Sequence, residues 1–386
     1  MVKLKILICA SEYPPYTSGA GNVVYNTVKY FRQAGHICKI CSPIGPDIKL
    51  CDSRVISLLS RVEIFYYLYS VIYYWWKARR YVIENTKKYD ILVLHNINPL
   101  VQWNSQITGN GTFITLHTTY FGHYKNVLHK GLMANYYKYM TQLEQESLKN
   151  MGEDAIFICV SPSTVDELIT EGVSKKRVRS ISNGVDVNRF KPCVSKINLR
   201  KELDLPENMT ILLSVGRITA QKNLFRLLEI FNRVQLFCSD LFLAIAGTGE
   251  LLSDLDSFIK ENNISNVRIL GYVEDSNLPF LYACSDYFII SSYYEGQPLT
   301  LLEAMASGLP CIVSNIPNLS IVKDADCGII VDFDDIEGAS NTILSYINSK
   351  LCESHSINSR SYAENNLDWE SVAKKYLKEF YSGYEG

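Results

Sequence analysis

The sequence has no excess of charge of either sign and no long apolar run. Its 38 lysines and arginines nearly balance 40 aspartates and glutamates, which gives a formal net charge of -2. A general nucleic-acid binder usually carries a basic excess, so we expect no nucleic-acid partner. The longest apolar stretch, Ile64 to Trp76, is shorter than the ~20 residues that a membrane-spanning helix needs. Internal repeats and low-complexity tracts are also absent.

The chain lacks the features of a secreted protein as well. Lys3 and Lys5 flank a short apolar run that continues as an expected strand, with no small-residue cleavage site behind it. The 11 cysteines are scattered through apolar segments, which is typical of reduced, buried thiols in the cytoplasm. Cys38 and Cys41 form a CxxC, but on a strand this spacing places them on opposite faces, and no second pair follows at zinc-site spacing. We therefore expect a soluble cytoplasmic protein, with a redox or zinc role at Cys38 and Cys41 as a lesser alternative.

What the chain does contain is a regular alternation of short apolar runs and helix-like segments over its 386 residues. This length favours two domains, and the alternation predicts an α/β fold with two parallel sheets covered on both faces. The first domain is expected at 1–190, a linker at about 186–206 and the second domain at 205–367. A terminal helix is expected within 368–386. The expected strands are Lys5–Ala10, Ile37–Cys41, Ile91–His95, Phe113–His117, Ala155–Val160, Val178–Ile181, Ile211–Val215, Leu241–Ala246, Val267–Leu270, Tyr287–Ile290, Cys311–Ser314 and Gly328–Val331.

In open parallel sheets, ligands bind at the carboxyl ends of the strands. Gly19 and Gly21 follow the first strand in a long loop, before a helix expected from about Val23 to Ala34. The dinucleotide fingerprint is not met, because a third glycine and an acid after the second strand are both missing. We expect a flexible loop that approaches a ligand's phosphate or sugar. A plain loop and a cofactor-dependent dehydrogenase are the alternatives.

Two histidines end expected strands of the first domain. His117 could accept a hydrogen bond from a sugar hydroxyl or stabilise a developing charge. His95 ends the preceding strand in the same way. Position alone therefore does not distinguish a functional role from the more common structural one.

The second domain has basic residues and glycines after its first two strands. Arg217 and Lys222 follow a glycine, Gly216, and could clamp a diphosphate, or could be two solvated side chains. Gly247, after the next strand, could offer backbone N–H groups to a ligand. Asp-x-Asp triplets can hold divalent ions, but we attribute the three in this chain to chance and expect no metal site. They are Asp254–Asp256, Asp324–Asp326 and Asp332–Asp334.

Two glutamates, Glu295 and Glu303, carry the clearest chemical signal. Gly296 and Pro298, between them, indicate a tight turn from a buried strand into a helix that spans Leu299 to Ala306. The first acid should project from the loop and the second from the first turn of the helix. Because a helix start attracts phosphates, acids placed there suggest a ligand with both phosphate and hydroxyl groups.

These motifs together resemble those of the retaining glycosyltransferases of the GT-B fold, known as glycosyltransferase family 4 or the group 1 type. Gly216-Arg217 with Lys222 resembles the family's diphosphate clamp, and Glu295-x7-Glu303 its double-glutamate signature. The similarity extends over nearly the whole chain. Weaker matches are the glycine loop at Gly19-Ala-Gly21, His117, the linker Asn183–Pro192 and the nucleobase-side loop Leu270–Val273. The chain departs from the family pattern at Ala20, where a glycine is common, and at Gln297, where relatives carry an aromatic or aliphatic residue.

The resemblance implies two Rossmann-like domains with a cleft between them, the terminal helix returning to the first domain. The first domain would bind the acceptor and the second the donor. Glu303 would accept hydrogen bonds from the ribose, Glu295 would contact the transferred sugar, and His117 would face it. Arg217, Lys222 and the helix start would hold the diphosphate. The implied donor-binding set is Gly19, Gly21, Gly216, Gly247, Val273, Gly296, Gln297, Leu299, Thr300 and Glu303.

The implied activity is transfer of a hexose-type sugar, with retention of configuration, to a glycan or lipid-linked glycan in cell-surface polysaccharide synthesis. The nucleoside-diphosphate sugar is the donor substrate, with UDP expected in preference to GDP, and neither a cofactor nor a metal is implied. Two alternatives remain open: a catalytically silent sugar-nucleotide-binding partner of another transferase, and a sugar-nucleotide epimerase.

The stretch 54–88 is unusually aromatic and basic. It could rest on an anionic membrane and reach a lipid-linked acceptor, which would place the protein at the inner face of the cell membrane. Alternatively, it is a helix packed against the strand Ile91–His95, with its lysines solvated.

Overall fold

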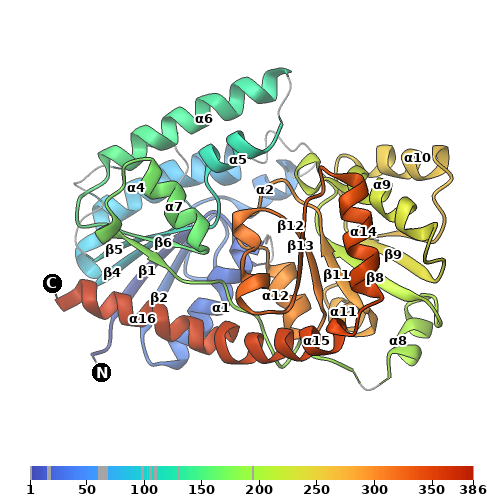
Figure 1. Ribbon diagram of the computed structural model, residues 1–386. Coiled ribbons are helices and arrows are strands. Elements are labelled where there is room, and N and C mark those ends of the chain that lie inside the picture. Colours follow the sequence, from blue (N-terminus) through green and yellow to red (C-terminus); the bar gives the residue numbers. More distant parts are fainter. Residues whose placement is uncertain are drawn as a thin grey trace. The chain divides into compact units, whose positions relative to one another are not determined.

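The computed structural model describes residues 2–14, 19–59, 68–96, 100, 101, 103, 107, 111–128, 131–193 and 195–385. The chain divides into two compact units (Figure 1). Unit 1 comprises Met1–Asn183 and Trp369–Gly386, and unit 2 comprises Gly184–Asp368. Each unit is built around one parallel sheet, so the predicted fold class is confirmed.

The sheet of unit 1 has the strand order β3-β2-β1-β4-β5-β6-β7. From β1 the chain adds strands on one side and then returns to start β4 on the other. The carboxyl ends of β1 and β4 therefore flank the point where the order reverses, which is where ligands bind in such sheets. The strands are β1 Lys5–Ala10, β2 Ile37–Ser42, β3 Ile48–Lys49, β4 Ile91–His95, β5 Thr112–Leu116, β6 Ile156–Cys159 and β7 Val178–Ser180.

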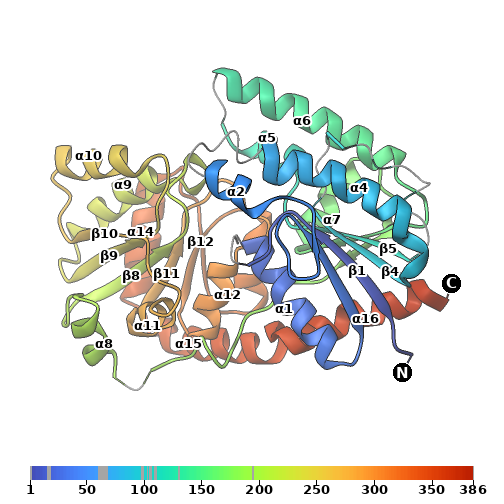
Figure 2. The same cartoon turned by 180° about the vertical axis from the view of Figure 1, so that it is seen from behind.

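Helices cover both faces of this sheet. On one face, α2 and α4 bury Ile56 and Trp75 against the strands (Figure 2). On the other, α1 and α16 lie beside each other, and the ring of Phe380 stands 5.5 Å from Phe31 and 4.7 Å from Phe113. The terminal helix thus completes the core of unit 1. The helices are α1 Gly19–Gln33, α2 Ser53–Leu59, α4 Tyr74–Asn85, α5 Tyr120–Asn126, α6 Gly131–Asn150, α7 Pro162–Thr170 and α16 Trp369–Glu385.

Unit 2 repeats the same winding, with the strand order β10-β9-β8-β11-β12-β13. All twelve strands expected from the sequence are present in the two units, within a residue or two at their ends. The two-residue strand β3 is an addition, too short to leave a pattern. The strands of unit 2 are β8 Thr210–Val215, β9 Leu241–Ala246, β10 Val267–Gly271, β11 Tyr287–Ile290, β12 Cys311–Ser314 and β13 Gly328–Val331.

The strands of unit 2 are buried on both faces, because alternate residues enter two separate apolar clusters. Phe288 and Ile290 pack with α11 and α12, whereas Tyr287 and Ile289 pack with α9 and α14. This explains why the strands are unbroken apolar runs in the sequence. The helices are α8 Lys196–Glu202, α9 Leu224–Gln235, α10 Leu252–Glu261, α11 Leu278–Cys284, α12 Leu299–Ala306, α13 Ile321–Asp324, α14 Ile336–Ile347 and α15 Leu351–Tyr362.

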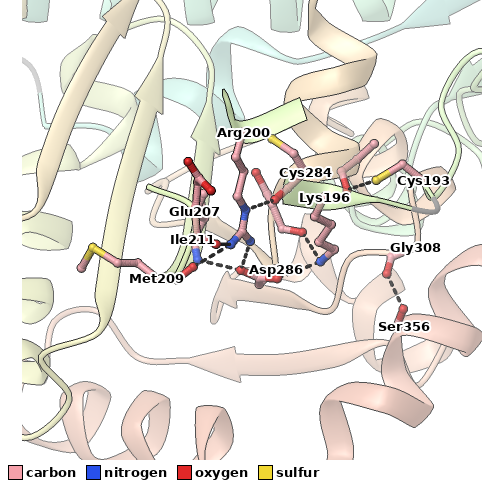
Figure 3. A network of polar contacts seen from close by, with 12 residues as sticks. Cys193, Lys196, Arg200, Glu207, Met209, Ile211, Cys284, Asp286, Gly308 and Ser356 are labelled. Carbon is pink, nitrogen blue, oxygen red and sulfur yellow. Dashed lines mark hydrogen bonds and ion pairs between the residues drawn. The ribbon is translucent and has the colours of Figure 1, made fainter. Parts of the chain in front are cut away.

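Residues 186–206, expected as a linker, belong to unit 2. Figure 3 shows the reason: Arg200, from α8, is buried and its guanidinium reaches the carboxylate of Asp286 at 2.6 Å. The same guanidinium donates to the carbonyls of Cys284 and Met209, and Lys196 also pairs with Asp286. Asp286 in turn accepts the N–H of Ile211. These bonds fasten α8 to the amino-terminal ends of β8 and β11.

The start of α1 differs from the sequence expectation. The helix begins at Gly19, not near Val23, so Gly19 and Gly21 form its first turn and are not part of an open loop. Gly21 is buried and continues the helix face of Val24 and Val28. The glycines gave no helix signal because their propensity is low, and the helical packing of the buried face outweighs it. Pro15 to Ser18, which precede the helix, lie outside the described residues.

The network around Arg200 makes a specific prediction about stability. Replacing Arg200 by Met should lower the free energy of unfolding by about 2–3 kcal/mol, because it removes one of the two cations that pair with the partly exposed Asp286 and leaves the carbonyls of Cys284 and Met209 without their donor. Urea unfolding of purified protein, followed by circular dichroism, measures this change. The matched control is Lys201→Met on the same helix, whose ion pair with Glu207 is exposed, so its loss should be below about 1 kcal/mol. Equal effects of the two substitutions would contradict the structural role of Arg200.

Candidate active site

The candidate residues of unit 2 lie in loops that follow the carboxyl ends of β8, β9, β10 and β11. Backbone hydrogen bonds join the first three loops, since Gly216 donates to Ala246 and Gly247 donates to Gly271. A Cβ at Gly247 would stand 1.8 Å from the carbonyl oxygen of Gly216. Glycine is therefore required there for the close approach of two backbones. Because the N–H of Gly247 is already used, it is not available to a ligand as the sequence suggested.

Lys222 and Glu295 form an ion pair at the centre of these loops. The ammonium of Lys222 lies 2.5 Å from Oε1 of Glu295, and the hydroxyl of Ser292 donates to the same oxygen at 2.6 Å. Both bonds go to Oε1, so Oε2 has no hydrogen bond from the residues that the structure describes. Glu295 is only 6% exposed. A Cβ at Gly216 would stand 3.2 Å from Cε of Lys222, so this glycine makes room for the lysine stem.

The loops that carry this pair are joined by further bonds. The N–H of Tyr293 donates to the carbonyl of Gln221 at 2.9 Å, and the Gln221 amide donates to the carbonyl of Tyr294 at 2.7 Å. The Ser291 hydroxyl donates to the carbonyl of Lys222 at 2.8 Å. Lys222 and Glu295 are thus positioned relative to each other before a ligand arrives, which is the arrangement that favours catalysis.

Arg217 lies at the same place but is exposed, in contrast to Lys222. Both side chains line one small pocket, together with Gly216, Ser291 and Ser292. The two cations that the sequence proposed as a clamp are therefore neighbours. A guanidinium that projects toward solvent and an ammonium held by a carboxylate could approach an anion together.

Glu303 lies in the second turn of α12, not in the first as its spacing had suggested. Tyr282 of α11 donates its hydroxyl to Oε2 of Glu303 at 2.9 Å. Burial raises the pKa of the Glu303 carboxyl to about 7, against the lowering effects of the Tyr282 hydroxyl and of Arg189. Arg189 is itself held by an ion pair with Asp275, at 2.8 Å. Glu303 is therefore a carboxyl that changes charge near neutral pH.

The turn between the two glutamates places the other expected residues beside them. Glu295 and Gln297 are both buried, and Leu299 and Thr300 open α12. No side chain caps this helix, and the N–H of Leu301 bonds back to the carbonyl of Pro298 at 3.1 Å, so the N–H groups of Leu299 and Thr300 are the ones open to a ligand. Val273, after β10, packs against the apolar cluster beneath α11 and α12.

Sequence reasoning missed three contributors to this site. Ser292 stands three residues before Glu295, and its hydroxyl gave no pattern of its own. Tyr282 sits in a short apolar helix, where it resembles a core residue. Arg189 lies in the segment expected to be a linker, and only the fold brings it near Glu303.

In unit 1, the two strand-end histidines contact each other. Nδ1 of His95 lies 3.2 Å from Nε2 of His117, and the rings stack with centroids 5.4 Å apart. Burial lowers the pKa of His117 to about 4, and burial together with His117 lowers the pKa of His95. Both rings are thus neutral at pH 7, and one of them donates to the other. Since Nε2 of His117 is engaged, Nδ1 is the nitrogen left to meet a ligand.

Three further findings concern metal ligands, membrane-spanning helices and cysteines. Within them, no three His, Cys, Asp or Glu side chains gather in a way that could hold a metal ion. No helix in the described ranges is long and apolar enough to cross a bilayer. All 11 cysteines are free thiols.

Comparison with known families shows what the chain is related to. Residues 17–189 match the family model described as Glycosyltransferase Family 4, and residues 195–366 match the model described as Glycosyl transferases group 1. The chain therefore belongs to the GT-B glycosyltransferases, and the predicted family is confirmed.

Among curated proteins, the chain is 31% identical over 217 residues to UDP-Gal:alpha-D-GlcNAc-diphosphoundecaprenol alpha-1,3-galactosyltransferase of Escherichia coli, covering 55% of this chain and 54% of that protein. It is 24% identical to alpha-monoglucosyldiacylglycerol synthase of Streptococcus pneumoniae, covering 82% of this chain and 72% of that protein. The match thus spans about half the length of the first relative.

Among solved structures, the glycosyltransferase WaaG, involved in lipopolysaccharide biosynthesis, has a TM-score of 0.74 at 16% identity, covering 97% of this chain and 99% of that one. Anabaena HepE in complex with UDP-glucose has a TM-score of 0.72 at 16% identity, covering 98% of this chain and 100% of that one. At these identities the two structures support the fold alone.

Proposed function

We propose that the chain transfers a hexose-type sugar, with retention of configuration, from a nucleoside-diphosphate sugar to a glycan or lipid-linked glycan in cell-surface polysaccharide synthesis. UDP is the expected nucleotide in preference to GDP. The observation that carries the proposal is the Lys222–Glu295 ion pair, because it joins the segment expected to hold the diphosphate to the acid expected to touch the donor sugar. The names of the relatives support the substrate classes, since one includes a UDP-Gal donor and a diphosphoundecaprenol-linked acceptor.

The geometry suits the charge that this reaction develops. When the bond between the sugar's anomeric carbon and the diphosphate breaks, negative charge grows on the leaving oxygen. Arg217, Lys222 and the N–H groups that open α12 would stabilise this charge, and fixed groups of this kind typically contribute several kcal/mol to lowering a barrier. The proposed mechanism uses these groups and requires neither a cofactor nor a metal.

The remaining groups would orient the sugar and the nucleoside. Glu295 would accept a hydrogen bond from a sugar hydroxyl through Oε2, while Lys222 and Ser292 hold Oε1 in place. Glu303 would accept bonds from the ribose. His117, as a neutral ring, would form a hydrogen bond to the transferred sugar and would not act as a cation.

Hydrolysis of the donor tests the proposed reaction. Purified protein should release nucleoside diphosphate from at least one of a set of UDP-, GDP- and ADP-sugars, because such transferases slowly pass the sugar to water. Glu295→Ala should lower this release by about 10²-fold, which is typical of removing one fixed transition-state contact. Glu337→Ala, which removes an exposed acid elsewhere in unit 2, should leave it unchanged. The same slow background from wild type and Glu295→Ala would instead favour a catalytically silent sugar-nucleotide-binding partner.

The pKa of Glu303 leads to a separate prediction about nucleotide binding. A ribose hydroxyl donates to the ionised carboxylate, so the affinity for UDP should fall as the pH drops through about 7 and Glu303 takes up a proton. Tyr282→Phe removes a bond that lowers this pKa, so the midpoint should move to higher pH. Isothermal titration calorimetry from about pH 8 to about pH 6 measures the change around the midpoint.

The control for this experiment is Glu303→Gln, which cannot titrate. The phosphate of UDP also titrates near pH 6, but it does so equally in every variant, so the difference between wild type and Glu303→Gln isolates the carboxyl. Parallel pH profiles for these two proteins would show that Glu303 does not contact the nucleoside.

We also propose a peripheral contact with the inner face of the cell membrane through α4. Tyr74, Trp75, Ala78 and Val82 pack into unit 1, so the helix does cover the sheet. Its opposite side, however, exposes Trp76 and Ile83 at 53–54% beside the exposed Arg80, and Tyr73, which directly precedes the helix, is 36% exposed. An aromatic and basic helix face of this kind binds anionic lipid surfaces. Ile64 to Tyr67, the start of the apolar stretch, lie outside the described residues.

Flotation with vesicles tests the membrane contact. The protein should float with vesicles that contain anionic lipid and not with purely zwitterionic ones. The double substitution Trp76→Ser with Ile83→Ser should abolish flotation. Leu236→Ser with Phe237→Ser, a control at two exposed apolar residues of unit 2, should not. If wild type stays at the bottom of the gradient with anionic vesicles, the membrane contact is wrong.

A further inference from the structure

Unit 2 contains a second pocket, of about 330 Å³, whose lining includes none of the residues assigned to the reaction. It shares only Leu224 with the small pocket that contains Arg217 and Lys222. A volume of this order is within the range of small-molecule sites. The lining residues are Ile218, Thr219, Ala220, Asn223, Leu224, Phe225, Arg226, Glu229, Leu251, Leu255 and Tyr293.

The walls of this pocket come from fixed parts of the fold. One wall is the first turn of α9, and another is the start of α10, which lies beside α9 in Figure 1. Tyr293 is held by its N–H bond to the carbonyl of Gln221. Phe225 packs its ring against Phe258 of α10, with centroids 5.4 Å apart. The pocket therefore has two aromatic residues in its walls, and the ring of Phe225 is held in place by its packing against α10.

Polar side chains also line the pocket. Asn223 is only 8% exposed and has a left-handed backbone, with φ of 53°. Its side chain does not cap α9, and its amide has no hydrogen bond from any described residue. Arg226 pairs with Glu229 at 2.8 Å through Nη1, and its side chain is 31% exposed, so the outer part of the guanidinium is open to a ligand. The Asn223 amide and the solvent-exposed part of the Arg226 guanidinium are therefore polar groups that a ligand in this pocket could bond.

The chemistry of the lining defines the class of ligand. Arg226 and Glu229 neutralise each other, so the pocket does not favour an ion of either sign. The amide, the guanidinium and the carboxylate offer both donors and acceptors, which suits a molecule with many hydroxyls and excludes a purely apolar one. Phe225 and Tyr293 supply apolar surface for the C–H face of a ring.

We propose that this pocket binds a neutral hexopyranose, either a free sugar or the terminal unit of a glycan. Such a ring combines hydroxyls on its rim with apolar C–H groups on its face, as the lining requires. The site is separate from the donor position, because different residues of the segment 214–224 line the two pockets. The proposal concerns binding and needs no turnover, so it can fail or hold independently of the transfer reaction.

Methyl NMR of the full chain tests the proposal directly, because Ile218, Leu251 and Leu255 line the pocket. Protein labelled at Ile and Leu methyl groups and saturated with UDP is titrated with glucose, galactose, mannose and maltotriose. At least one sugar should shift these three methyl signals saturably. Tighter binding of maltotriose than of glucose identifies the end of a glycan, and equal binding of the two identifies a free sugar.

Two substitutions assign the binding to the pocket. Arg226→Met keeps the apolar stem, and Asn223→Gly keeps the left-handed backbone. Each should weaken the sugar's Kd by about tenfold, the usual effect of losing a hydrogen bond to a buried polar group. Arg233→Met, on the same helix but paired with Glu337 at the surface, should not change it. The proposal is overturned if no sugar produces saturable shifts, or if neither pocket substitution alters the Kd.

Discussion

The arrangement of the candidate site depends on the contact between Lys222 and Glu295. The two residues are 73 positions apart and reach each other because β8 and β11 are neighbours in the sheet. The loops after these strands are then joined by the bonds of Gln221 and Ser291. One ion pair, almost removed from solvent, thus sets the relative position of the groups proposed to meet the diphosphate and the groups proposed to meet the sugar.

Three further contacts hold the loops and helices around this ion pair in place. Gly216 leaves space for the stem of Lys222, and Gly247 allows two backbones to touch. Tyr282 connects the helix before β11 to the helix after it through the Glu303 carboxyl. Each of these contacts ties an element of the sheet scaffold to a group at its carboxyl edge. The parallel sheet therefore holds side chains from distant parts of the sequence in fixed positions at its carboxyl edge.

Much of the fold could be predicted because buried parallel strands leave an unbroken apolar signal. Phe288 and Ile289 are buried in different apolar clusters, so an apolar residue is favoured at both positions. The candidate residues after the strands followed from the same logic. The sequence could not show which residues from different elements contact each other. Tyr282, for example, has the pattern of a core tyrosine, and only the structure shows that its hydroxyl bonds Glu303. The start of α1 was expected too late, because the packing of its buried face outweighs the low helix propensity of Gly19 and Gly21. The linker was expected too long, because the Arg200–Asp286 ion pair joins residues far apart in the sequence.

The division of the chain has a consequence for synthesis on the ribosome. Unit 1 is interrupted, since residues 184–368 form unit 2 and α16 returns only afterwards. Until residues 369–385 emerge, Phe31 and Phe113 lack the ring of Phe380 that covers them. At a synthesis rate of about 5–20 residues per second, this side of the nascent unit 1 stays uncovered for roughly ten seconds or more, while unit 2 is made and can fold. Unit 1 is thus the first to be synthesised and the last to be completed. During that interval its uncovered apolar face is the part of the nascent protein that a chaperone would bind.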